Sequence, residues 1–425
     1  MAWALYDFGN SAFTTLVVTF IYATYFTKTM APTEAEGTAL WARGITTTAL
    51  FVAVLSPLTG AIADRGGLRK RLLMLSTLAI IVPTALLAGV APGAATQALV
   101  LFVIANVAFE LSGTFYNAFL PVIAPPDRIG RVSGYGWGTG YIGGLLCMAV
   151  ALVGFVQPEV PWFGISREAG ANIRATNVLV AVWMAVFCLP LFLWVPDPRP
   201  PHPSPLGHVI RDSFRQLGAT FRGLRRYRHA VRFLVARLFF NDGLTTIFSF
   251  GGIYAAGSFG FTFTEILYFG LALNIAAGIG GFVFGAIDDK LGGKRTVMIS
   301  LVGLALAASF ALITTTKAGL WIAGVVIGIF SGPNQAASRS LMGRFVPRGK
   351  ENEFFGFFNF SGKATSFLGP LILSIITGAT HSQRLGLIVV VVFFLIGLAL
   401  VTRVDEQEGI ALARQPLPKE DPAAP

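Results

Sequence analysis

Long apolar stretches restrict the fold of this 425-residue chain more than any other feature. A helix needs about 20 residues to cross the hydrocarbon core of a bilayer, and twelve stretches approach or exceed that length. They are continuously apolar, whereas the strands of a membrane β-barrel alternate between apolar and polar residues. Charged residues make up only 12% of the chain, against about 25% in soluble proteins. We therefore predict an all-α polytopic membrane protein.

The predicted spans form two sets of six. The first set comprises residues 3–27, 41–63, 72–91, 97–121, 133–156 and 173–195. The second set comprises residues 230–257, 264–287, 296–314, 317–342, 353–379 and 384–402.

One loop sequence occurs twice. Gly60–Arg71 returns, in slightly shorter form, as Gly285–Arg295, just over half the chain length later. Each copy joins the second and third predicted spans of its set. The first spans also match, because Asn10–Thr15 is echoed by Asn241–Thr246. This duplication indicates two parallel six-helix halves.

Basic residues predict the orientation of the chain. Of its 32 Lys and Arg residues, 23 lie in the loops and tail on one side of the predicted membrane. Loops rich in Lys and Arg remain in the cytoplasm, so we expect both termini to be cytoplasmic. The net charge of +11 follows from these loops, and we therefore exclude nucleic-acid binding.

These patterns divide the chain into four parts. We assign 1–196 to an N-terminal half, 197–229 to a cytoplasmic Arg/Pro-rich linker, 230–403 to a C-terminal half and 404–425 to a cytoplasmic tail. The tail is charged and Pro-rich, which predicts disorder.

The linker contains one recurring apolar pattern. The residues Val209, Phe214, Leu217, Phe221 and Leu224 follow one another at near-helical spacing among arginines. A helix lying on the membrane surface and a solvated linker both fit this pattern.

The repeated loop resembles the signature of the major facilitator superfamily, which reads roughly G-x-x-x-D-R-x-G-x-R-K/R. The first copy matches it at Gly60, Asp64, Arg65, Gly67, Arg69 and Lys70. The second copy matches it less closely, at Gly285, Asp289, Lys290, Gly292, Lys294 and Arg295.

A narrower resemblance covers nearly the whole chain. Trp3–Phe13, Phe115–Pro121, Ser133–Trp137 and Gly332–Ser340 resemble the bacterial "Unknown Major Facilitator" family. That family is related to fungal vacuolar effluxers linked to autophagy, which are implicated in amino-acid efflux. The resemblance implies a twelve-helix fold with two pseudo-symmetric halves in the bacterial inner membrane. Family members often carry residues ahead of Trp3, so we expect a cytoplasmic lead to be missing here.

Six ionisable residues lie within predicted spans. They are Asp7, Glu110, Arg237, Asp242, Arg339 and Lys363. A charge at bilayer depth costs at least about 2.5–3.5 kcal/mol, so such residues normally face a wet cavity or a partner.

Polar neighbours extend these positions into stripes along single helix faces, since residues three or four apart share a face. The resulting candidates for substrate binding or coupling are Asp7, Asn10, Asn106, Glu110, Tyr116, Asn117, Arg237, Asn241, Asp242, Asn334, Gln335, Arg339, Asn359 and Lys363. The superfamily resemblance implies that the first, fourth, seventh and tenth helices line a central cavity, and all four carry such a stripe.

Two interpretations of the intramembrane charges remain open. In the first, Arg237 or Lys363 holds a substrate carboxylate, and Glu110 or Asp242 carries a coupling proton. Asp7 and Arg339 lie nearer the cytoplasmic ends, where gating contacts form. In the second, these charges form static pairs between helices, as buried charges often do.

The repeated loop also has two interpretations. The resemblance implies that Asp64 meets the start of the eleventh helix and latches the cytoplasmic side shut. Alternatively, the bases only set the topology. The second copy carries an additional acid, Asp288, and Lys290 in place of Arg. We therefore expect unequal latches, with the first dominating gating.

Together these features predict a monomeric secondary transporter that exports an amino acid or similar zwitterion by alternating access, with proton coupling. Membrane lipids and a small-molecule substrate are the expected partners, without cofactor or metal. The alternatives are a carrier of lipids or amphipathic metabolites with the same fold and a non-transporting membrane receptor or sensor. An apolar cavity with lateral openings would favour the carrier, whereas the intramembrane charges weigh against the receptor. Enzyme activity is not expected, because no nucleophile–base pair, metal spacing or phosphate loop occurs.

Overall fold

The computed structural model describes residues 1–197, 206–222 and 226–415, and no strand occurs among them. The first group of helices comprises α3 (Glu34–Gly66), α4 (Arg69–Leu87), α5 (Ala95–Asn117), α6 (Leu120–Ile123), α7 (Ile129–Ala151) and α8 (Ala171–Trp194), preceded by a composite helix over Ala2–Met30. The second group comprises α10 (Arg228–Phe259), α11 (Phe263–Leu291), α12 (Gly293–Ile313), α13 (Lys317–Phe345), α14 (Glu351–Lys363), α15 (Leu368–Thr380) and α16 (Gln383–Thr402).

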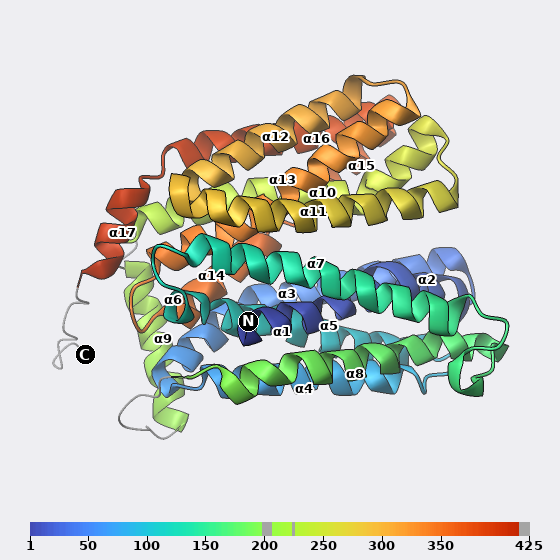
Figure 1. Cartoon of the computed structure of the whole chain (residues 1–425), viewed down its shortest axis with the longest axis horizontal. Helices are drawn as coiled ribbons and strands as arrows, with labels where there is room; N and C mark the ends of the chain where they lie inside the picture. The colour runs from blue at the N-terminus through green and yellow to red at the C-terminus, as the bar shows by residue number, and fades with distance from the viewer. Residues whose placement is uncertain (198–205, 223–225, 416–425) are drawn as a thin grey trace.

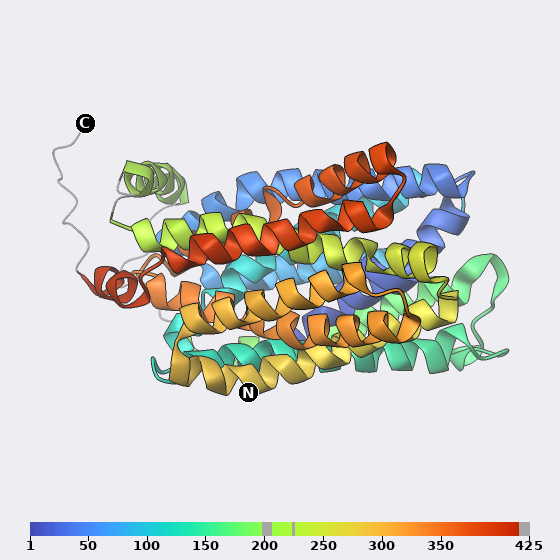
Figure 2. The ribbon, with the colours of Figure 1, turned by 90° about the horizontal axis from the view of Figure 1, so that it is seen from above.

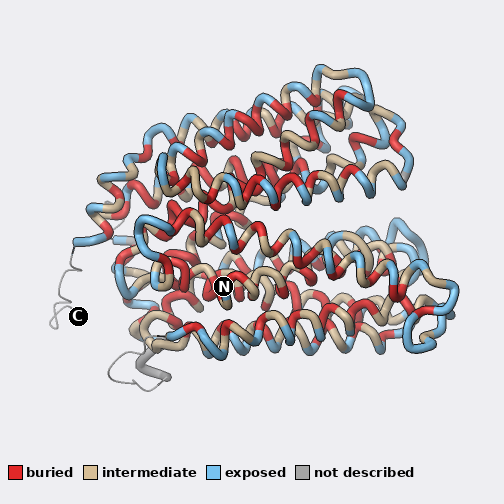
Figure 3. The backbone as a smooth tube through the Cα atoms, in the orientation of Figure 1, coloured by how far each residue is buried: buried red, intermediate tan, exposed pale blue. Residues whose placement is uncertain are grey.

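The two groups lie side by side with their long helices roughly parallel (Figure 1). Apolar side chains form one large buried cluster within residues 3–195 and a second within residues 227–404, to which the first group adds Ala118. Buried positions follow the inner faces of the helices, and exposed positions follow the outside (Figure 3). Many exposed side chains are apolar, as expected where a helix faces lipid.

Eleven helices of the described chain are long and apolar enough to cross a membrane. The first predicted span is the twelfth. It runs without interruption through α1 (Ala2–Ala12), a π-helix (Phe13–Phe20), α2 (Ile21–Tyr25) and a second π-helix (Phe26–Met30). No single segment of it is long enough to span alone, because α and π geometry alternate. The twelve-span prediction is confirmed.

The eleventh predicted span is interrupted. The apolar pattern predicts one helix over 353–379, whereas α14 ends at Lys363 and α15 begins at Leu368. A proline ring clashes with the carbonyl group four residues earlier, which here belongs to Ser366. The break lies at this carbonyl, and Pro370 itself falls in the first turn of α15, where no N–H is required.

Two short helices lie at one end of the bundle, which we call the repeat end because both copies of the repeated loop lie there. They are α9 (Leu206–Arg222) and α17 (Glu406–Arg414). Figure 1 shows α9 running across the ends of the long helices, and Figure 2 shows it at the edge of the bundle.

The predicted disorder of the tail is wrong for residues 406–414, which form α17. The Glu408 N–H donates to Asp405 Oδ1 (2.9 Å), which caps this helix and lowers the pKa of Asp405 from its ordinary value. The last ten residues, 416–425, and the proline-rich start of the linker, 198–205, lie outside the described residues.

Close helix packing gives a first prediction. A Cβ added at Gly143 in α7 would overlap the carbonyl oxygen of Phe8 in α1, whereas one added at Gly113 in α5 would meet nothing within 4 Å. Overpacking of this kind costs about 1–3 kcal/mol. We expect Gly143→Ala to lower the melting temperature in detergent, and Gly113→Ala to leave it unchanged or raise it. Equal melting temperatures for the two variants would contradict this packing.

Candidate functional site

Asp64 in the last turns of α3 caps the start of α14. Its Oδ1 accepts from the backbone N–H of Asn352 (3.0 Å), and its Oδ2 accepts from that of Glu353 (2.8 Å). The Asn352 side-chain amide adds a third bond to Oδ1 (2.6 Å). The first N–H groups of a helix have no partner within the helix and carry positive partial charge. A carboxylate therefore binds there favourably, and this arrangement is the first capping contact.

Other residues of the first loop copy support this contact. Arg69 pairs with Glu351 at 3.1 Å, and any side chain at Gly60 would overlap the Asn352 carbonyl. Lys70 contacts its own half, because its Nζ donates to the Val195 carbonyl (2.7 Å). Arg65 lies in the last turn of α3, and Gly67 ends that helix with φ of 57°.

The second loop copy makes a matching contact in the opposite direction. Asp289 in α11 accepts from the N–H groups of Gly130 (2.7 Å) and Arg131 (3.3 Å), and Arg131 Nε lies 3.2 Å from Asp289 Oδ2. In both contacts the acid reaches the second and third residues of a helix in the other half. We call this the second capping contact.

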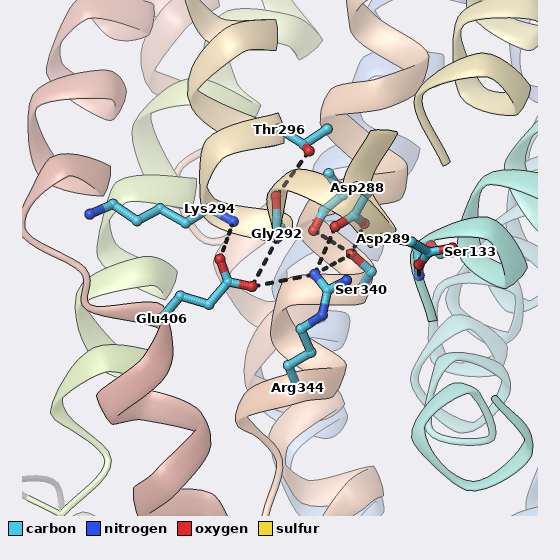
Figure 4. A network of polar contacts seen from close by, with 12 residues as sticks. Ser133, Asp288, Asp289, Gly292, Lys294, Thr296, Ser340, Arg344 and Glu406 are labelled. Carbon is cyan, nitrogen blue, oxygen red and sulfur yellow. Dashed lines mark hydrogen bonds and ion pairs between the residues drawn. The ribbon is translucent and has the colours of Figure 1, made fainter. Parts of the chain in front are cut away.

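The second copy is also tied to its own half (Figure 4). Asp288 is buried, pairs with Arg344 at 2.7 Å and accepts from the Ser340 hydroxyl. Glu406 of α17 accepts from the backbone N–H groups of Gly293 and Lys294, both at 2.9 Å. The first copy shares only part of this arrangement, because Asp197 accepts from the Lys70 N–H (3.2 Å) near the start of α4, as Glu406 does from Lys294 at α12.

The remaining residues of the second copy have backbone or surface roles. Gly285 lets α11 approach the Gly130 carbonyl of α7, and Gly292 adopts a φ of 89° between α11 and α12. Lys294 Nζ donates to the Thr402 carbonyl (3.1 Å), while Lys290 and Arg295 are exposed.

Deeper in the bundle, Asp7 and Arg339 form an ion pair between the halves at 3.1 Å. Arg339 also donates to the Ser133 hydroxyl (2.9 Å) and to Asn117 Oδ1 (3.2 Å). Its guanidinium lies 4.9 Å from the Trp3 ring, which stacks on Tyr116. This Arg339 cluster joins three helices of the first half to α13.

A second ion pair links the halves. Lys363 Nζ, at the end of α14, lies 2.7 Å from Glu110 Oε1 in α5. Asn359, one turn earlier, donates to the Glu110 carbonyl (2.6 Å). The side chains of Lys363 and Glu110 are 35% and 15% exposed, so this pair is reachable by solvent, unlike Arg339.

The break between α14 and α15 is surrounded by polar groups of α10. Arg237 donates to the Phe358 carbonyl (2.7 Å), with its guanidinium 3.8 Å from the Phe358 ring centroid. Asn241 donates to the Gly362 carbonyl (2.9 Å) and accepts from Gln335 (3.3 Å). These bonds occupy carbonyl oxygens near the C-terminal end of α14.

Asp242 lies on the other side of this break. Its Oδ2 accepts from the Gly369 N–H (3.1 Å) in the first turn of α15, and its Oδ1 has no hydrogen-bond partner. It is only 2% exposed. Within the described part of the chain no basic side chain pairs with it.

Three predicted candidates lie apart from these groups. Asn106 donates to Thr48 (3.3 Å) between α5 and α3, and Asn334 donates to Ser300 (3.0 Å) on the α12 side of α13. Asn10 is buried in α1, with its side-chain oxygen unbonded. Asn334 is therefore placed for helix packing, away from the groups that surround the break.

Some polar residues at this site were not among the predicted candidates. Ser133, Asn352, Glu353 and Glu406 complete the contacts described above. Acids in the first turn are typical of a helix start, and the Glu351–Glu353 segment carries that signal. No sequence pattern around Glu406 indicated its role, because the helix that it caps, α12, is distant in the sequence.

Comparison with known proteins identifies the family. Residues 32–414 match the family described as "Vacuole effluxer Atg22 like". The chain belongs to this family. It is 26% identical to an uncharacterized MFS-type transporter of Bacillus subtilis, over 97% of this chain and 96% of that protein. It is 24% identical to autophagy-related protein 22 of Yarrowia lipolytica, over 85% of this chain and 74% of that protein.

Solved structures share the fold. The proton:xylose symporter XylE matches with a TM-score of 0.75 at 11% identity, covering 97% of this chain and 96% of that one. The transporter FucP in its outward conformation matches with a TM-score of 0.74 at 13% identity, covering 95% and 98%. This protein is thus a multi-pass membrane transporter of the major facilitator superfamily.

The first capping contact gives a second prediction. Asp64→Asn removes the charge and one of two acceptor oxygens, so we expect a larger population that is open at the repeat end. Ser56, buried beside Asn359, would report this state after Ser56→Cys in a background with Cys147→Ala and Cys188→Ala. We expect faster reaction of that thiol with a hydrophilic reagent.

Asp127→Asn is the matched control, since Asp127 is an exposed acid at the same end. It should leave the labelling rate unchanged. An unchanged rate in Asp64→Asn as well would contradict a gating role for this contact.

Proposed function

We propose that this transporter exports an amino acid or a similar small zwitterion, coupled to protons, by alternating access. The supporting observation is the Glu110–Lys363 pair, which joins the halves and remains partly exposed. A zwitterion carries one carboxylate and one ammonium group. When such a substrate binds between them, its ammonium group pairs with Glu110 and its carboxylate pairs with Lys363. Neither side chain is then left without a partner of opposite charge.

Arg237 is less suited to hold the substrate carboxylate. It is buried, and its donors bind the Phe358 carbonyl and the Ser361 hydroxyl. Removing it from these groups would leave a buried guanidinium without these acceptors, which is costly in an apolar environment. We therefore assign the carboxylate to Lys363, and we assign Arg237 to holding the end of α14.

Asp242 is the proposed proton carrier. One oxygen is bonded to a backbone N–H and the other is unpartnered. Burial without a cation disfavours a charge, and a proton on the free oxygen removes it. Because Asp242 contacts α15 while Arg237 and Asn241 contact α14, a movement across the break would change its hydration and release the proton.

The orientation and assembly remain part of the proposal. We place the repeat end in the cytoplasm of a bacterium, with both termini there, because the basic loops gather at this end. The two capping contacts and the Arg339 cluster then act as cytoplasmic latches. The protein acts as a monomer in the inner membrane.

A third prediction tests the coupling. In proteoliposomes with an imposed pH gradient, we expect Asp242→Asn to reduce gradient-driven transport at least tenfold while retaining exchange of substrate across the membrane. Glu110→Gln should weaken both activities, because it disrupts substrate binding as well.

The substrate is found first by thermal-shift screening of amino acids on the purified protein, and uptake is then measured with the best ligand. Asp127→Asn, at an exposed site, should transport normally. Full gradient-driven transport in both Glu110→Gln and Asp242→Asn would refute proton coupling through these residues.

One observation favours an amphipathic cargo instead. A cavity of about 360 Å³ lies between α10, α15 and α16, with a largely apolar lining that includes Phe250, Tyr254 and Leu373. Ile253 at this cavity is 54% exposed on the outside of the bundle, so an acyl chain can enter from the side. Thermal stabilisation by amphiphiles but by no amino acid would favour this function.

A further inference from the structure

Helix α9 has two opposite faces with different chemistry. Its inner face carries Ser213, Gln216 and Thr220, which are buried against the bundle. These three polar residues recur at a spacing of three and four, so they share one side of the helix. Among the apolar side chains of this helix, Phe214 is exposed and Leu217 is half-buried.

The inner face touches the first capping contact directly. Gln216 donates to the buried carboxylate of Glu353, whose own N–H binds Asp64. Lys350, the residue before α14, donates to Thr220 (2.7 Å) and lies 3.8 Å from Glu353. The position of α9 is therefore linked to the start of α14 through two separate side chains.

The outer face is basic with one aromatic group. Arg211, Phe214, Arg215 and Arg222 are exposed, and Phe214 is 58% accessible. On a helix with 3.6 residues per turn these four positions lie about 130–170° round from the inner face. Asp212 is the one acid of the helix, and it lies on neither face.

The setting of α9 suits a membrane surface. The helix crosses the ends of the spans at the edge of the bundle (Figures 1 and 2), close to where the lipid headgroups begin. Arginines around an aromatic ring are the composition of helices that lie in the headgroup region. An exposed phenylalanine ring is more favourable in contact with the acyl-chain boundary than in water.

We propose that the outer face of α9 binds anionic phospholipids of the cytoplasmic leaflet and thereby holds the first capping contact closed. This proposal uses the cytoplasmic placement of the repeat end given above, and it is independent of the substrate. Each arginine near an anionic surface strengthens binding about fivefold. The inner face then transmits that binding through Gln216 and Lys350 to α14.

Fluorescence in nanodiscs tests the lipid contact. The full-length protein, with Cys147→Ala and Cys188→Ala, is labelled at Ala219→Cys, which is exposed at the edge of the outer face. Discs contain phosphatidylcholine alone or with an equal part of phosphatidylglycerol. We expect blue-shifted emission and at least twofold weaker quenching by acrylamide, a neutral quencher, in the anionic discs.

Two variants serve as controls. Arg211→Gln/Arg215→Gln/Arg222→Gln should lose the lipid dependence, with its melting temperature unchanged because all three side chains are exposed. A label at Gln407→Cys, exposed on the acid-rich α17, should show no lipid dependence. Equal emission and quenching in both lipids, or a triple variant that still responds, would overturn the lipid site. Binding of an acidic peptide in place of lipid would also overturn it.

The link to the capping contact has its own measurement. The Ser56→Cys thiol should react at least threefold more slowly in anionic discs than in neutral ones. Gln216→Ala/Thr220→Ala, which removes both contacts to α14, should abolish this difference while keeping the fluorescence response of α9. Equal labelling rates in the two lipids, together with a normal fluorescence response, would show that α9 binds lipid without controlling the first capping contact. None of these measurements uses transport, so their failure leaves the proposed function intact.

Discussion

The structure depends on one kind of interaction, a carboxylate from one half bound to the open N-terminus of a helix in the other. Asp64 does this at α14, and Asp289 does it at α7. Each carboxylate meets N–H groups that have no partner in their own helix, so both sides of the contact are satisfied together. Because such bonds are short and directional, a small tilt between the halves breaks them. Closure at the repeat end is therefore a discrete state rather than one point on a continuous range.

The two contacts are equivalent in geometry but different in their surroundings. Asp64 is supported from outside its half, by the Arg69–Glu351 pair and by the α9 inner face next to Glu353. The second loop is bound within its own half, through Asp288, Arg344 and Glu406 (Figure 4). This difference makes the first contact the more open to regulation, and unequal roles in gating stay a prediction.

Farther from the repeat end, the interrupted eleventh span offers backbone groups for hydrogen bonding that a continuous helix would use internally. Its break exposes carbonyl groups of α14 and N–H groups of α15 within the bundle, and Arg237, Asn241 and Asp242 of α10 bind them. Such irregular backbone persists at membrane depth only where side chains satisfy it. The same break places Lys363 at a helix end, opposite Glu110. Backbone irregularity and ion pairing thus occur together at the proposed transport site.

The sequence predicted the spans and the duplication, since hydropathy and a repeated motif are local signals, whereas the contact of Asp64 with the eleventh span was implied by the superfamily resemblance. It placed the intramembrane charges on the correct helices, but it left their partners open, because Asp7–Arg339 and Glu110–Lys363 join residues from opposite halves. It did not predict the break in the eleventh span, because the groups that satisfy the broken backbone come from α10. The folding of α17 was missed because its short sequence is polar, and its position depends on Glu406 reaching α12. Asn334 and Gln335 were both predicted as cavity residues, but adjacent residues on a helix point in different directions. Asn334 contacts Ser300 of α12, whereas Gln335 contacts Asn241.

The central claim is that the two halves move relative to each other as rigid bodies, so that one end of the bundle opens when the other closes. Distances between paired spin labels test it most directly. One pair joins the exposed sites Arg128 and Arg348 at the repeat end, and the other joins Val160 and Thr315 at the opposite end. The account predicts two distance populations for each pair, with every condition that lengthens the first distance shortening the second. A single fixed distance at both ends, or changes of the same sign, would contradict it.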